Sequence, residues 1–149
     1  MLRRRTRERR WAAAFAADIL AGCDELFAVY GGEELNLPIT IPIDRAGVVL
    51  LQPGGPLDAP RVPATMAVTR PAAGACEIRV ERVDGGGMVI PGLGESPLPA
   101  LAVTVTAAGL DIGPGSLPLD EQVAGALATA LILTIGMKLA KAGGADGYR

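Results

Sequence analysis

The sequence predicts a single α+β domain, in which a long amino-terminal helix, an antiparallel sheet or meander of about six strands and an apolar carboxy-terminal helix follow one another. Three observations lead to this fold class. Apolar residues recur at helical spacing before position 30, alternate with polar residues in the region 35–107, and form a charge-free run over 123–137. At 149 residues the chain has the length of one ordinary domain, so we expect 1–149 to be one unit.

The first helix is expected over residues 7–30. Apolar side chains recur there every three or four positions and would share one face of the helix. They are Trp11, Phe15, Ile19, Cys23, Leu26 and Tyr30. Gly31 and Gly32 follow as a stop signal, so the helix is expected to end at Tyr30.

The clearest strand pattern in the chain lies over residues 35–43. Leucine and isoleucine at the odd positions alternate there with polar residues and proline, which is typical of a strand with one buried face. Pro38 and Pro42 both lie on the polar side. Because proline cannot donate a backbone hydrogen bond, we expect this strand to leave one edge unpaired.

Further short strands are expected between turns rich in glycine and proline. They cover residues 48–51, 64–69, 76–83, 88–90 and 98–107, and a loop is expected over 109–117. Within 76–83, the charged residues Glu77, Arg79 and Glu81 alternate with apolar ones. The antiparallel sheet is therefore expected to have one apolar face and one solvated face.

The second helix is expected over residues 118–142, where Gly143 and Gly144 would end it. Its segment 123–137 carries no charge and is apolar on nearly every side, so we expect this helix to be buried all round. A domain of this size has little sheet with which to cover it. We therefore expect a homo-oligomer to cover the remainder.

A membrane span is not expected in this helix. The charge-free run is shorter than the roughly 20 residues that a span needs. Glu121 and Lys138 also close its two ends.

Charge is distributed unevenly along the chain. Six arginines against one glutamate give the first ten residues a charge of +5, and the remaining eight basic and fifteen acidic groups give −7. The arginines of this basic arm, residues 1–10, are Arg3, Arg4, Arg5, Arg7, Arg9 and Arg10. They fit nonspecific contact with nucleic-acid phosphates, docking on an anionic membrane or on the acidic surface of a neighbouring subunit, or a solubilising frayed end.

No residue pattern points to catalysis, a metal or a cofactor. The chain has no histidine, which removes the usual nucleophile pairs and histidine-ligated zinc. Neither Ser96 nor Ser116 lies in a nucleophile motif, and the glycine-rich loops lack the phosphate-binding pattern. We therefore expect no metal and no cofactor, and the sequence favours a non-enzymatic role without deciding it.

Cys23 and Cys76 are too few for a disulfide framework, so we expect two reduced, buried thiols, with one bridge between them as the alternative. The apolar stretch after the basic arm is interrupted by Asp18 and does not resemble a secretory signal. We therefore expect a cytoplasmic protein or a component of an assembled particle, and not a secreted one.

The leading functional hypothesis is a self-associating structural subunit that builds a ring, a shell or a phage-like particle. It follows from the excess of apolar surface and the missing catalytic chemistry. The residues expected at the subunit interface are Leu127, Leu131 and Ile135 of the second helix and Leu37, Ile39 and Ile41 of the first strand. The basic arm would then meet acid on a neighbour or packaged nucleic acid.

Two alternative functions remain open. A chaperone-like or adaptor module would bind a partner peptide along the free edge of the strand 35–43. A small ligand-binding protein, or an enzyme that uses carboxylates or Tyr30, would instead need a pocket of several hundred Å³, on the order of typical ligand sites.

Overall fold

The computed structural model describes residues 2–50, 60–94, 96–113 and 121–147. Along these residues the chain forms α1 (Leu2–Tyr30), β1 (Glu34–Pro42), β2 (Arg61–Thr69), β3 (Ala75–Arg82), β4 (Leu101–Thr106), β5 (Gly109–Gly113) and α2 (Glu121–Gly147). The α+β class, with a helix at each end of an antiparallel meander, is confirmed. The sheet has five strands in the order β1-β2-β3-β4-β5, each antiparallel to the next.

The register of the strands gives the sheet one apolar face and one polar face. One row across all five strands consists of Leu35, Val68, Ile78, Val103 and Ile112, and every member is buried. The neighbouring row on the opposite face consists of Glu34, Thr69, Glu77, Thr104 and Asp111. This is the result of the period of two in each strand.

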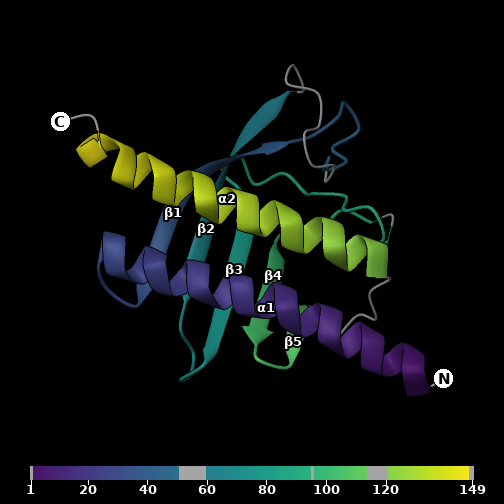
Figure 1. Cartoon of the computed structure of the whole chain (residues 1–149). Coiled ribbons are helices and arrows are strands. Elements are labelled where there is room, and N and C mark those ends of the chain that lie inside the picture. The colour runs from purple at the N-terminus through teal and green to yellow at the C-terminus, as the bar shows by residue number, and fades with distance from the viewer. Residues whose placement is uncertain (1, 51–59, 95, 114–120, 148–149) are drawn as a thin grey trace.

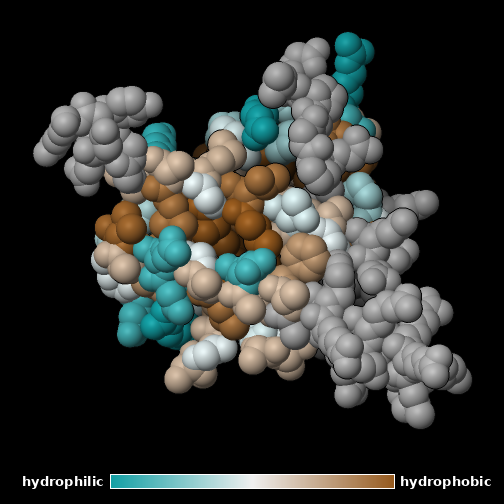
Figure 2. Space-filling model, viewed as in Figure 1, coloured by the Kyte–Doolittle hydropathy of each residue, from teal (hydrophilic) through white to brown (hydrophobic). Residues whose placement is uncertain are grey.

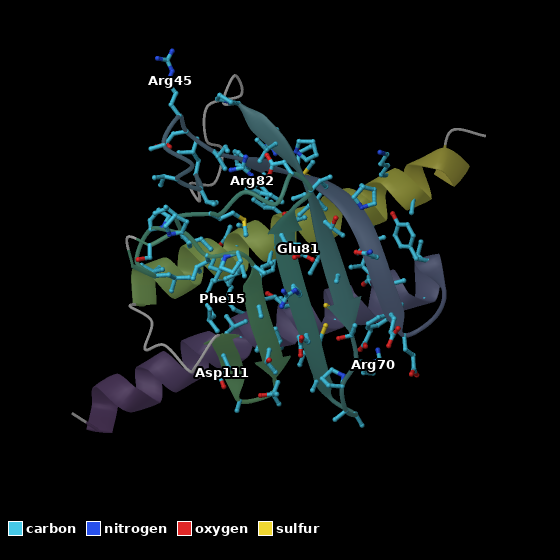
Figure 3. All side chains as sticks on the ribbon, turned by 180° about the vertical axis from the view of Figure 1, so that it is seen from behind. Phe15, Arg45, Arg70, Glu81, Arg82 and Asp111 are labelled. Atoms are coloured by element: carbon cyan, nitrogen blue, oxygen red, sulfur yellow. The ribbon has the colours of Figure 1, made fainter. Side chains whose placement is uncertain are left out.

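Both helices lie on the apolar face of the sheet (Figure 1). The view from behind shows the polar face uncovered by either helix (Figure 3). Helix α1 packs on the strands and buries Ile19 and Leu26 completely. Helix α2 runs beside α1, and a Cβ atom added at Gly22 would lie only 2.9 Å from Cγ2 of Ile135, so the glycine permits a close approach.

The strand predictions need two corrections. The segments 48–51 and 88–90 form isolated bridges, namely Ile43 with Val49, Val48 with Val89 and Met88 with Leu98, because each is too short between its turns to build a ladder. Strand β5 lies in the expected loop 109–117, where Leu110 and Ile112 alternate with Asp111. Its two flanking glycines concealed this alternation.

The helix boundaries also differ from those expected. Helix α1 begins at Leu2 and not at residue 7, because arginine is a good helix former and the basic arm continues the helix. It ends at Tyr30 as predicted, and Gly31 follows with φ of 81°. Helix α2 continues past Gly143 and Gly144 to Gly147, since glycine costs only about 1 kcal/mol in a helix and does not forbid it. The expected start at 118 lies outside the described residues.

Candidate functional site

The apolar side chains left open to solvent gather on the helix layer. Five large hydrophobic residues are exposed in the described part of the chain, and four of them belong to the end of α1 or to α2. They are Val29, Tyr30, Leu133 and Met137, whereas Val83 lies at the end of β3. Figure 2 shows hydrophobic residues gathered over α2. The surface of α2 is therefore the candidate functional site.

Helix α2 is not buried all round by the described part of its own chain, and the expectation that an oligomer covers the remainder stays a prediction. Among the described side chains of α2, one stripe is buried, formed by Leu127, Ala128, Leu131 and Ile135. Because these positions follow helical spacing, the opposite side of the same apolar run faces away from the core. On that side Leu133 is 51% exposed and Met137 is 66% exposed.

We call this outward surface the open face of α2. It comprises Ala126, Thr129, Ala130, Leu133, Gly136, Met137 and Ala140, all of them at least partly exposed. None of these residues is charged. A Cβ atom added at Gly136 would meet nothing within 4 Å, so nothing in the described chain covers the helix there.

Charged groups lie at the border of the open face. On α2, Lys141 lies one turn after Met137. Lys138 lies seven residues after Leu131, on the side of the buried stripe, and partial burial, followed by repulsion from Lys141, holds its pKa below the ordinary value of 10.5. On α1, Asp18 and Glu25 are exposed. Beyond the basic arm, the helix layer thus carries exposed acidic groups on α1 and basic groups on α2.

The two helices are joined firmly enough to present this surface as one unit. The hydroxyl of Tyr30 at the end of α1 donates a hydrogen bond to the carbonyl oxygen of Lys138 on α2, at 3.1 Å. Eight residues before Tyr30 on the same helix, Gly22 allows Ile135 of α2 to pack directly on α1. The open face is therefore held at two points along α1.

The residues predicted for the subunit interface lie inside the chain's own core. Leu127, Leu131 and Ile135 are 2–5% exposed, and Leu37 and Ile41 are also buried, while Ile39 is half-buried. Three of them lie on the same helix as the open face, but the prediction did not include Leu133 and Met137, which are exposed there. Their signal was their place in the same charge-free run, opposite the buried stripe.

The basic arm forms the first turns of α1. The helix begins at Leu2, and its amino-terminal part extends past the edge of the sheet beside β5 (Figure 1). The arginines therefore lie on a helix that points away from the body of the chain. Their side chains lie outside the described part of the structure.

The free edge of the sheet is the second surface predicted from sequence. Strand β1 is at one end of the strand order, which confirms the unpaired edge. The amide of Ile43 donates to Pro60 at 3.0 Å on the β2 side, whereas the carbonyl of Pro42 accepts from Leu50 at 2.9 Å on the other side. Because these directions alternate along a strand, Pro38 and Pro42 both face the free edge and leave it without two donors.

A shallow surface hollow of about 600 Å³ is lined by Glu33, Glu34, Thr69, Arg70 and Pro71. Arg70 is already engaged, because it donates to the carboxylate of Asp24 and lies over the ring of Phe27, at 4.8 Å from its centroid. Among the described residues no group of three or more His, Cys, Asp and Glu side chains could hold a metal ion. The hollow thus presents the carboxylates of Glu33 and Glu34 and one cation, Arg70, that is already paired with Asp24.

By length and composition, residues Gly125–Ala142 of α2 also form a helix apolar enough to cross a membrane. Only 22% of that stretch is buried in the described chain. The same exposed apolar surface thus fits either a protein partner or lipid. The charged groups around this surface are what distinguish the two.

Comparison with known proteins provides no assignment: the chain matches no protein-family model, no curated protein and no solved structure.

Proposed function

We propose that this chain is a non-enzymatic, self-associating subunit of a larger assembly, and that it pairs with a second copy of itself through the open face of α2. The observation that carries the proposal is the exposure of Leu133 and Met137, at 51% and 66%, on a helix surface without charge. Large apolar groups on one continuous surface are typical of interaction sites.

The composition of the open face suits a helix as its partner. Complete burial of one leucine or methionine side chain stabilises by roughly 1.5–3 kcal/mol, and each copy would contribute the exposed part of two. Ala130, Gly136 and Ala140 surround them with small side chains. Small residues let two helices approach closely and so increase the contact around the two larger groups.

Charge complementarity favours a second copy as the occupant. Lys141 borders the face on α2, and Asp18 and Glu25 are exposed on α1. In a two-fold pair each copy would contribute both signs, so basic groups of one helix layer could face acidic groups of the other. A lipid surface would offer no such match for Asp18 and Glu25.

The basic arm would make a second contact that extends pairs into a ring, shell or phage-like particle. It carries +5, and the remainder of the chain carries −7, so the arm of one copy and the body of a neighbour attract each other. Packaged nucleic acid would satisfy the same arginines and is a separate outcome of the test below. Such an assembly fits the reducing compartment that two free thiols suggest.

The adaptor alternative is weaker because the free edge of β1 is interrupted. A peptide added to this edge would find no amide donor at Pro38 or Pro42. The ligand-binding alternative would depend on the hollow beside Arg70, whose cation is already paired with Asp24. Self-association uses a surface that nothing else in the described chain occupies.

The test is the absolute mass of the purified chain by light scattering, for the wild type and for the double variant Leu133→Lys, Met137→Lys. We expect the wild type to be oligomeric and the variant to fall to smaller species, because two buried lysines would be left unpaired at the interface. Val83→Lys is the matched control, since Val83 is as exposed as Met137, at 66%, but lies in the turn that follows β3, away from both helices. A monomeric wild type, or an equal loss in the control, would refute pairing through α2.

The role of the basic arm needs a separate variant. Replacing the six arginines by glutamine keeps good helix formers and removes the charge. We expect this variant to stop at the α2 pair, and high salt to have the same effect on the wild type. Absorbance at 260 nm on the same peak identifies bound nucleic acid, and its loss in the variant would assign the arm to phosphate contact.

A further inference from the structure

The two cysteines meet in the core. Cys23 lies on α1 and is 1% exposed, and Cys76 lies on the inner face of β3 and is 2% exposed. Both are free thiols, and they are hydrogen-bonded to each other. They are also the only two cysteines in the sequence, so the fold has brought together the whole thiol content of the chain.

We propose that Cys23 and Cys76 form a redox-sensitive link, which closes to a disulfide between α1 and the sheet when the chain meets a low-molecular-weight disulfide. Because each thiol acts directly on the other, the fold already brings together the two side chains that a disulfide would join. The link would attach the helix layer covalently to the strand at the centre of the sheet. It does not depend on the proposed assembly.

The surroundings of the pair give the two thiols different roles. The hydrogen bond from Cys23 lowers the pKa of Cys76 and outweighs burial, which raises it, and the positive charge of Arg70 also lowers it. The same hydrogen bond and burial raise the pKa of Cys23. The acidic groups facing the pair, Asp24 and Glu77, oppose ionisation. Cys76 is therefore the first thiolate, and Cys23 is the resolving thiol.

The reaction balances as two successive thiol–disulfide exchanges. The Cys76 thiolate attacks one sulfur of oxidised glutathione, forms a mixed disulfide and releases one glutathione thiolate. Cys23 then loses its proton and attacks the Cys76 sulfur, which releases the second glutathione thiolate. The chain loses two protons and two electrons, and the oxidant takes up two electrons to become two thiols.

Burial makes the link conditional on motion of α1. No oxidant reaches thiols that are 1–2% exposed unless the helix briefly opens from the sheet. Formation of the disulfide then fixes α1 to the sheet at Cys23, next to Gly22. At Gly22, α2 packs on α1 through Ile135. The pair would thus convert a transient opening into a locked helix layer.

The experiment incubates the full-length folded chain with oxidised glutathione, denatures it in acid, alkylates the remaining thiols and measures the mass. We expect the wild type to lose two hydrogen atoms, to take up no alkyl group and to remain a single chain. Its thermal midpoint should exceed that of the reduced chain, and a reducing agent should reverse the shift. Cys23→Ala should instead retain glutathione, because no resolving thiol remains.

The same incubation in urea provides the comparison that can overturn the proposal without any variant. If the disulfide forms in urea but both thiols of the folded chain stay alkylatable, the fold protects the pair and no link operates. A disulfide that joins two chains, or one that lowers the thermal midpoint, would also overturn it.

Discussion

The two helices use their apolar residues in different ways. Helix α1 directs Ile19, Leu26 and their neighbours into the core and leaves alanines and acids, such as Ala21 and Glu25, outside. Helix α2 buries one stripe of similar quality and still exposes Leu133 and Met137. Among the described side chains, the large exposed apolar groups of α1 are Val29 and Tyr30 at its end, whereas those of α2 lie within the helix. This difference supports the proposal that α2 belongs to an interface.

The largest effect should come from a substitution in the buried surface of α1. Leu26→Ala removes a completely buried side chain from α1 and should lower the free energy of unfolding by about 2–5 kcal/mol in urea titrations. Leu133→Ala, on the open face of α2, should change it by less than about 0.5 kcal/mol under dilute conditions. A similar loss of unfolding free energy in the two variants would mean that Leu133 is packed within its own chain, which would contradict the open face.

Two helical glycines sharpen the contrast between a covered and an uncovered surface. Gly22→Ala forces a methyl group against Ile135 at 2.9 Å, and overpacking of about 1–3 kcal/mol should exceed the gain in helix propensity. Gly136→Ala meets nothing within 4 Å and should stabilise the chain by up to about 1 kcal/mol. Thermal unfolding should thus shift in opposite directions, and a shared sign would contradict the packing described here.

Arg70, which follows β2, attaches α1 to the sheet through its ion pair with Asp24. Among the described contacts, no ion pair attaches α2 to the sheet. Arg70→Met should cost about 1 kcal/mol, because it removes the ion pair with Asp24 and the contact with the Phe27 ring at 4.8 Å. Arg79→Met is the matched control, since Arg79 pairs with Glu81 at 3.9 Å on the open sheet face with both side chains half exposed. Chemical denaturation should show little change for the control.

The smallest effect concerns Lys138, which follows the buried stripe of α2. Its pKa is held below 10.5 in the folded chain, so the unfolded chain binds the proton more tightly and stability should rise as pH increases toward that value. Lys138→Gln should remove this rise, and Lys141→Gln should remove only the smaller part due to repulsion. The measurement is the difference in unfolding free energy between wild type and variant across alkaline pH. A difference that falls with pH would contradict the sign.

Much of the fold could be predicted because it follows from local periodicity. The alternation in 35–43 identified β1 and its inward residues, and the glycine at position 31 identified the end of α1. Strand β5 escaped because Leu110 and Ile112 make too short a pattern between glycines. The segments 48–51 and 88–90 were overestimated for the opposite reason, since their apolar residues pair only at single bridges.

The candidate site could be predicted only in part. The charge-free run identified α2 as unusual, and the same run concealed which side would remain exposed. Leu131 and Leu133 are indistinguishable by residue type, yet the first is 5% exposed and the second 51%. A helix that is apolar in every direction has no periodic signal to orient it.

The sequence by itself determined the class of the fold, the inward face of each long strand and the uneven charge along the chain, because these follow from residue spacing and composition. Only the tertiary structure decided that Ile135 packs at Gly22, that Cys23 meets Cys76 and that Leu133 and Met137 remain outside. Those outcomes depend on contacts between residues far apart in the chain, which local spacing does not encode.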